Sequence, residues 1–343
     1  MKKIILKGGI FLVIILIILW LLNEMLPFSW GNRMLHTKVE YLNKDNNKQK
    51  FNSFFLGSST TYRHIIPSLF DSLLQEQRLV SFNLGTDGCY PTHIYNILEN
   101  VLKESNEDIK YIFVTISTFD PLPETRFHST KTKYFTKLKW YYQELKYLFY
   151  LEADNKKKAD LLRKYSITYW ENIFKINMRR DVINYIVGKG KFGESVLGKN
   201  KDGYRKLPGK ITEIEWMAKT IPKFVGKTKR SWSTVKKDQS NYNKGHLDLI
   251  ENLITKSKEN GTHLVFILPP ARYAHHATEN YDQIYSLYGA IDEKHKIELC
   301  DPAKYPTLYN SEYYWDASHF NSKGARIYTR LLGEEVRRLL EDH

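Results

Sequence analysis

Residues 51–59 read FNSFFLGSS, and this stretch decides the fold of the chain. Residues 51–57 form a short apolar run that ends in glycine, which is typical of a buried strand. Ser59 follows the strand, ahead of residues 67–77, which we expect to be helical. Open parallel sheets bind their ligands at the carboxyl ends of strands, so Ser59 is well placed for chemistry. The alternative is that the glycine and serines form only a turn that caps a helix.

Four more apolar segments predict the rest of a sheet, at residues 79–84, 110–117, 262–268 and 296–300. Residues 246–260 and 322–340 instead repeat their apolar residues at helical spacing. The alternation of helix and strand indicates an α/β fold.

Two residues near the C-terminal end complete a candidate site. Asp316 and His319 lie three positions apart, in a segment that we expect to be the loop before the last helix. A serine hydroxyl is a weak nucleophile unless an imidazole takes its proton, and a carboxylate fixes the tautomer of that imidazole. Ser59, His319 and Asp316 supply these groups, so we expect them to act as nucleophile, base and orienting acid.

With these motifs the chain resembles the SGNH, or GDSL-type, family of esterases and acyltransferases. The family's Gly-Asp-Ser block corresponds to residues 57–59, with Ser59 at the nucleophile position, and its Asp-x-x-His block to Asp316 and His319. Its oxyanion glycine falls on Gly88. The resemblance implies a flavodoxin-like sandwich around a five-stranded parallel sheet of order 2-1-3-4-5. It also implies an oxyanion hole made by the N–H groups of Ser59 and Gly88, and chemistry that needs no cofactor and no metal.

The third block of the family, usually Gly-x-Asn-Asp, reads Ser-Thr-Phe-Asp at residues 117–120. The asparagine that supplies a side-chain oxyanion donor is missing, and one such donor is worth roughly a hundredfold in rate. Three features together resemble one branch of the family: this departure, the Gly-Ser-Ser first block and the N-terminal segment. That branch contains the D-alanyl-lipoteichoate transfer protein and the alginate O-acetylation proteins.

The N-terminal segment predicts a signal-anchor. Three lysines precede residues 10–22, which are thirteen apolar residues without a charge, and basic flanks stay in the cytoplasm. We therefore expect a transmembrane helix in residues 1–28 and an extracytoplasmic SGNH-like domain in residues 29–343. A cleaved signal peptide is the main alternative, but residues 23–28 offer no small-x-small cleavage site.

A basic, aromatic-rich insertion at residues 121–245 separates the third and fourth predicted strands. It carries 29 Lys and Arg against 12 Asp and Glu, a net charge of +17, whereas the whole chain carries +14. Three interpretations remain open: a helical cap with a solvated basic face, attraction to anionic lipid headgroups, and recognition of an anionic or sugar-rich polymer. Nucleic acid also fits basic charge with aromatic side chains, but the outward topology argues against it.

The sequence thus predicts a membrane-anchored serine esterase or O-acyltransferase that acts on acyl esters of a cell-surface glycan or wall polymer. Its expected partners are an acylated glycan or an anionic cell-envelope polymer, the membrane and other membrane-bound biosynthetic proteins. A second hypothesis is a noncatalytic polymer-binding or assembly protein that keeps the fold. The sequence does not choose between hydrolysis and transfer.

Overall fold

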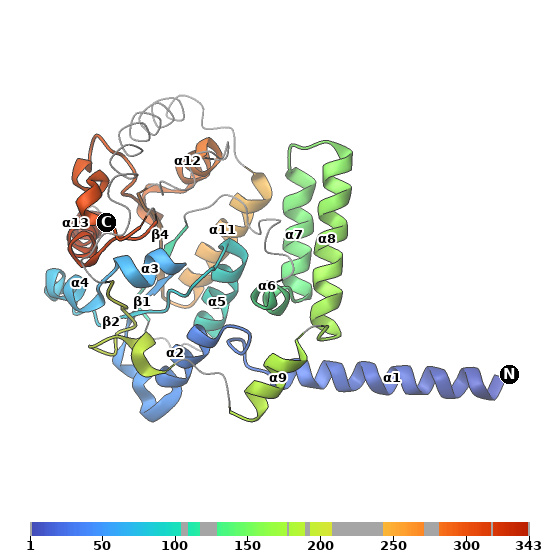
Figure 1. Cartoon of the computed structure of the whole chain (residues 1–343). Coiled ribbons are helices and arrows are strands. Elements are labelled where there is room, and N and C mark those ends of the chain that lie inside the picture. The colour runs from blue at the N-terminus through green and yellow to red at the C-terminus, as the bar shows by residue number, and fades with distance from the viewer. Residues whose placement is uncertain are drawn as a thin grey trace. The chain divides into compact units, whose positions relative to one another are not determined.

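The computed structural model describes residues 2–103, 109–116, 129–176, 178–188, 193–207, 243–270, 281–316 and 318–341 (Figure 1). The chain divides into two compact units. One comprises Met1–His36 and Pro123–Lys191, and the other comprises Thr37–Leu122 and Phe192–His343. The boundary at His36 falls inside helix α2 (Arg33–Asn43).

The second unit is built around a five-stranded sheet of order β2-β1-β3-β4-β5, in which all neighbouring strands are parallel (Figure 1). The α/β class and the strand order that we predicted are confirmed. Each predicted strand segment contains one strand of the sheet: β1 is Ser53–Leu56, β2 Ser81–Asn83, β3 Tyr111–Thr115, β4 His263–Leu268 and β5 Lys296–Glu298.

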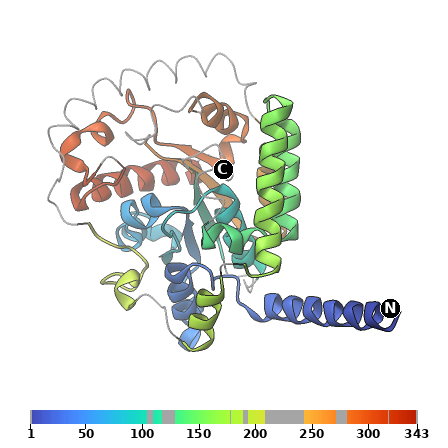
Figure 2. The same ribbon diagram turned by 45° about the vertical axis from the view of Figure 1, so that its right-hand side comes forward.

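Helices cover both faces of this sheet. Helices α4 (Pro67–Leu73) and α13 (Ser322–Glu341) pack on one face, and α5 (Pro91–Lys103) and α11 (Lys244–Glu259) pack on the other (Figures 1 and 2). A strand that is covered on both sides has no solvent face, which explains why the strand segments read as continuous apolar runs. The unit also contains α3 (Ser59–His64) and α12 (Tyr281–Ala290).

Aromatic packing fixes the centre of the sheet on the face that α4 covers. Phe55 of β1 pairs in register with Phe113 of β3, and their rings stack with centroids 5.0 Å apart. Phe70 of α4 meets Phe55 edge-on, also at 5.0 Å. All three side chains are fully buried, and burial of such a side chain stabilises the fold by about 1.5–3 kcal/mol.

The other unit contains α1 (Lys2–Met25) and helices from the first half of the insertion: α6 (Thr130–Phe135), α7 (Leu138–Tyr150), α8 (Asn155–Ile173) and α9 (Arg179–Ile186). Tyr141 of α7 stacks on Tyr169 of α8, and its hydroxyl hydrogen-bonds with that of Ser166. A nearly buried ion pair, Lys133 with Glu171 at 2.9 Å, joins α6 to α8. Residues 208–242 of the insertion lie outside the described residues.

The expected transmembrane helix at residues 1–28 is not supported. In the part of the chain that the structure describes, no helix combines the length and the apolar character needed to cross a membrane.

Candidate active site

Ser59 lies at a sharp turn between a strand and a helix. Strand β1 ends at Leu56, Ser58 keeps an extended backbone, and α3 begins at Ser59. Gly57 makes this turn possible, because a Cβ at that position would clash with Oγ1 of Thr61 and approach Thr115 to 3.1 Å. Ser59 is thereby held at the carboxyl end of β1, as the sequence predicted.

Asp316 and His319 lie in the loop before α13, also as expected. The backbone pairing of Tyr314 with Phe320 closes this loop, and the N–H of Trp315 donates to the carbonyl of His319 over 2.7 Å. Oδ1 of Asp316 accepts from the backbone N–H of His319, at 2.9 Å. These bonds hold the carboxylate and the imidazole on one short, folded segment.

The structure brings the three side chains together. Nε2 of His319 lies 2.9 Å from Oγ of Ser59, and Nδ1 lies 2.9 Å from both carboxylate oxygens of Asp316. An ionised carboxylate can only accept, so Nδ1 of His319 carries a proton and, in the neutral ring, the lone pair of Nε2 faces the serine hydroxyl. This is the arrangement that a serine nucleophile needs.

The carboxyl group of Asp316 is suited to orient the imidazole. Partial burial alone raises its pKa, but the hydrogen bond from His319, the charge of that residue and the backbone N–H of Ser318 hold the pKa below its ordinary value. Asp316 therefore remains ionised near neutral pH. The side chain of His319 is 17% exposed and that of Asp316 is 37% exposed, so solvent and small ligands can reach the site.

The loop after β2 carries the expected oxyanion glycine, Gly88. The N–H of Leu84 donates to the carbonyl of Phe55 over 2.8 Å, and the N–H of Thr86 donates to that of Gly57 over 3.1 Å, so the loop runs alongside the end of β1. Among the described residues, the N–H groups of Ser59 and Gly88 have no protein acceptor. Both are free to donate to a ligand. The third block, residues 117–120, lies outside the described residues.

Lys38 stabilises the loop after β2, a role that the sequence analysis did not predict. Its ammonium donates to the carbonyls of Asn83, Gly85 and Gly203 over 2.8, 2.7 and 3.0 Å. Burial lowers the pKa of Lys38 to about 7, and the nearby charge of Asp202 opposes that shift. Three acceptors match the three protons of an ammonium group, so the lysine ties together backbone segments that are far apart in sequence. No local pattern marks such a residue.

His64 is the second residue that sequence reasoning missed. It is buried in α3, and its Nε2 accepts the backbone N–H of Phe320, the residue after the proposed base. The hydroxyl of Thr329 in α13 donates to the carbonyl of His64 at 3.1 Å. These contacts join the helix that begins at Ser59 to the loop that carries His319.

Nothing in the described part of the chain gathers three or more His, Cys, Asp or Glu side chains where they could hold a metal ion. His263, for example, lies on β4, and its Nε2 is 2.8 Å from the carbonyl of Lys294. In comparisons with known proteins, no family model and no curated protein matches the chain.

Proposed function

We propose that the chain is a serine-dependent ester hydrolase or O-acyltransferase of the SGNH type. The observation that carries the proposal is the continuous hydrogen-bonded series from Ser59 Oγ through the His319 imidazole to the Asp316 carboxylate. The flavodoxin-like sandwich that the resemblance implies fits the observed strand order, which supports the same family.

The proposed reaction begins when Oγ of Ser59 attacks the ester carbonyl carbon and Nε2 of His319 takes the hydroxyl proton. Asp316 stabilises the imidazolium that forms. The carbonyl oxygen becomes an oxyanion, for which the N–H groups of Ser59 and Gly88 are the proposed donors. Collapse of this intermediate breaks the bond to the alkoxide, which leaves with the proton from His319. Ser59 then carries the acyl group as an ester.

The second half of the reaction releases that acyl group. Nε2 of His319 takes a proton from an acceptor hydroxyl, and the acceptor oxygen attacks the acyl carbon. Water as acceptor gives hydrolysis, whereas a sugar hydroxyl gives transfer. In either case the proton returns to Ser59 when the acyl–oxygen bond breaks, and the enzyme is regenerated.

The proposed substrate is an acyl ester of a cell-surface glycan or wall polymer, with the chain held at the outer face of the cytoplasmic membrane. Support for this location comes from the sequence pattern, in which lysines precede the uncharged residues 10–22. The proposed partners are the acylated or anionic polymer and other membrane-bound biosynthetic proteins.

A noncatalytic polymer-binding or assembly protein is the second candidate. The missing asparagine in residues 117–120 and the net charge of +17 in the insertion favour it. It predicts polymer binding that survives Ser59→Ala but weakens when Lys156, Lys157 and Lys158 are changed to Gln. The enzyme proposal predicts the opposite sensitivity for turnover.

The experiment that separates the two candidates measures turnover of a small acetyl ester by the full chain, in water and with a polyol acceptor. Wild type, Ser59→Ala and His319→Ala are compared with Ser58→Ala, in which the neighbouring hydroxyl is removed. Turnover that is lost in the first two variants and kept in the third supports the enzyme. A folded wild-type chain without turnover would favour the binding protein.

A further inference from the structure

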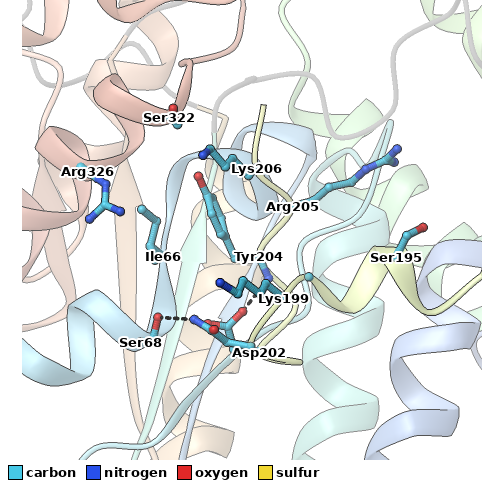
Figure 3. A pocket seen from close by; sticks show the side chains of 12 residues that line it. Ile66, Ser68, Ser195, Lys199, Asp202, Tyr204, Arg205, Lys206, Ser322 and Arg326 are labelled. Carbon is cyan, nitrogen blue, oxygen red and sulfur yellow. Dashed lines mark hydrogen bonds between the residues drawn. The ribbon is translucent and has the colours of Figure 1, made fainter. Parts of the chain in front are cut away.

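A pocket of about 550 Å³ opens in the sheet-containing unit, on the segment that follows the first half of the insertion (Figure 3). Its lining comes from three parts of the chain: the start of α4, residues 195–206, and the first turns of α13. A pocket of this size accommodates a ligand of one or two sugar units.

Positive charge dominates this lining. Lys199, Arg205, Lys206 and Arg326 are all exposed, and in the described part of the chain none of them forms an ion pair. The lining contains one carboxylate, that of Asp202. A concave surface with charges of one sign concentrates its field and attracts ligands of the opposite sign.

The carboxylate of this lining, Asp202, is buried, whereas the four cations are exposed. It is 7% exposed, and its carboxylate accepts the backbone N–H of Tyr204 at 3.1 Å. Its electrostatic partner in the interior is Lys38, which is fully buried. The negative charge of Asp202 therefore faces the positive charge of Lys38 inside the protein.

The polar ends of three side chains are well placed for an anion. In Figure 3 the hydroxyl of Tyr204 and the amino group of Lys206 point the same way, with Arg326 on the neighbouring helix, whereas Arg205 points elsewhere. Burial raises the pKa of Tyr204 to about 12, so its hydroxyl keeps the proton that it can donate. The hydroxyls of Ser68 and Ser322 add uncharged polar groups to the lining.

The pocket shares its supporting elements with the proposed catalytic residues. The N–H of Arg205 donates to the carbonyl of Tyr62, in the helix that begins at Ser59, over 2.9 Å. Ser322, which lines the pocket, comes three residues after His319, so their Cα atoms are at most about 11 Å apart. The pocket is thus built on backbone segments that adjoin Ser59 and His319.

We propose that this pocket binds an anionic sugar unit, with a phosphate or carboxylate on Arg326 and Lys206 and sugar hydroxyls against Tyr204, Ser68 and Ser322. Arginine binds both anions through paired hydrogen bonds, so the pocket accepts the shared chemistry of the two. That this unit belongs to the substrate of Ser59 rests on the proposed function, whereas the binding itself does not.

Calorimetric titration of the full chain tests the proposal, with Ser59→Ala as background so that no turnover interferes. Glucose 6-phosphate and glucuronate are the two anionic probes, and glucose is the uncharged probe. Arg326→Gln and Lys206→Gln each remove one charge from the pocket. Lys103→Gln removes the same charge from the exposed end of α5 and is the matched control.

We expect at least one anionic probe to bind with one-to-one stoichiometry and glucose to bind more weakly. Arg326→Gln and Lys206→Gln should each weaken anion binding about tenfold, and Lys103→Gln should leave it within twofold. A preference for one probe identifies the anion. Absence of binding at millimolar concentrations, or an equal loss in all three variants, would overturn the proposal. Because turnover of a small ester is measured separately, failure here would leave the proposed function standing.

Discussion

Nε2 of His64 accepts a hydrogen bond from the backbone N–H of Phe320, with 2.9 Å between the two nitrogens. His64 ends the helix that Ser59 begins, and Phe320 directly follows His319. The bond therefore connects the two segments whose separation sets the distance between Ser59, the proposed nucleophile, and His319, the proposed base. The ring of the buried His64 also lies edge-on to that of His319, with centroids 6.1 Å apart. We therefore predict that His64 is a positioning residue.

Replacement of His64 tests this connection. His64→Ala leaves the N–H of Phe320 without its acceptor, which should lower the free energy of unfolding by about 1–3 kcal/mol. It should also slow the labelling of Ser59 by a fluorophosphonate about tenfold or more, because small displacements at a site are costly. In His64→Gln the amide oxygen can accept the N–H of Phe320, so this variant should recover part of the lost stability and part of the lost labelling rate. An unchanged labelling rate in His64→Ala would contradict the positioning role.

Asp316→Asn tests the orientation of the imidazole. An amide can donate to Nδ1 of His319, which favours the tautomer whose Nε2–H points at Ser59 and cannot take its proton. We expect turnover to fall by about 10²- to 10⁴-fold, while the fold is retained. Glu312→Gln removes a carboxylate from the preceding turn and is the control. If Asp316→Asn kept the turnover of Glu312→Gln and of the wild type, Asp316 would have no part in the reaction.

The turn at Gly57 should tolerate no side chain. Gly57→Ala would place a Cβ against Thr61 and Thr115 in a buried turn, and such overpacking costs about 1–3 kcal/mol. Gly193→Ala is the matched control, because a Cβ there meets nothing within 4 Å and the backbone has an ordinary φ of −60°. Urea unfolding of the two variants measures the difference. Similar stabilities of the two variants would show that the turn can accommodate a Cβ at position 57.

His246 should make stability depend on pH. It is buried in α11, its Nε2 lies 2.6 Å from the hydroxyl of Tyr95, and burial lowers its pKa to about 4. The unfolded chain binds this proton near pH 6.5, so between about pH 6.5 and pH 4 it holds more protons than the folded chain. Stability should therefore fall as the pH falls through this window, by about 3 kcal/mol in all.

Urea unfolding at pH 7 and pH 5 measures this loss, and the comparison with His246→Gln isolates it. The glutamine does not titrate, and its amide can still bond with Tyr95. The variant should lose less stability than the wild type between the two pH values. An equal loss in both proteins would assign the pH dependence to other groups.

The sequence was most informative about the sheet and the ends of its strands. The strand segments are continuous apolar runs because both faces of the sheet are covered, and that pattern can be read locally. Ser59, Asp316 and His319 could also be predicted, because the turn after a parallel strand and the Asp-x-x-His spacing are local features. The structure places Ser59 directly after β1 and the other two residues in the loop before α13, the positions in the fold that the sequence indicated.

The supporting residues could not be predicted, because their roles depend on distant parts of the chain. Lys38 binds carbonyls at residues 83, 85 and 203, and only the folded chain brings these together. Nothing in the sequence around His64 indicates that its ring accepts the backbone N–H of Phe320. The anion pocket likewise combines residues around 66, 200 and 326, none of which forms a motif.

The proposed function requires Ser59 to be a nucleophile that His319 activates. The most direct measurement treats the full chain with a fluorophosphonate and maps the adduct by peptide mass spectrometry, beside Ser59→Ala, His319→Ala and Ser58→Ala. We predict one adduct per chain on Ser59, lost in the first two variants and kept in Ser58→Ala. A folded wild-type chain that forms no adduct, or an adduct that persists in Ser59→Ala, would show that Ser59 is not an activated nucleophile.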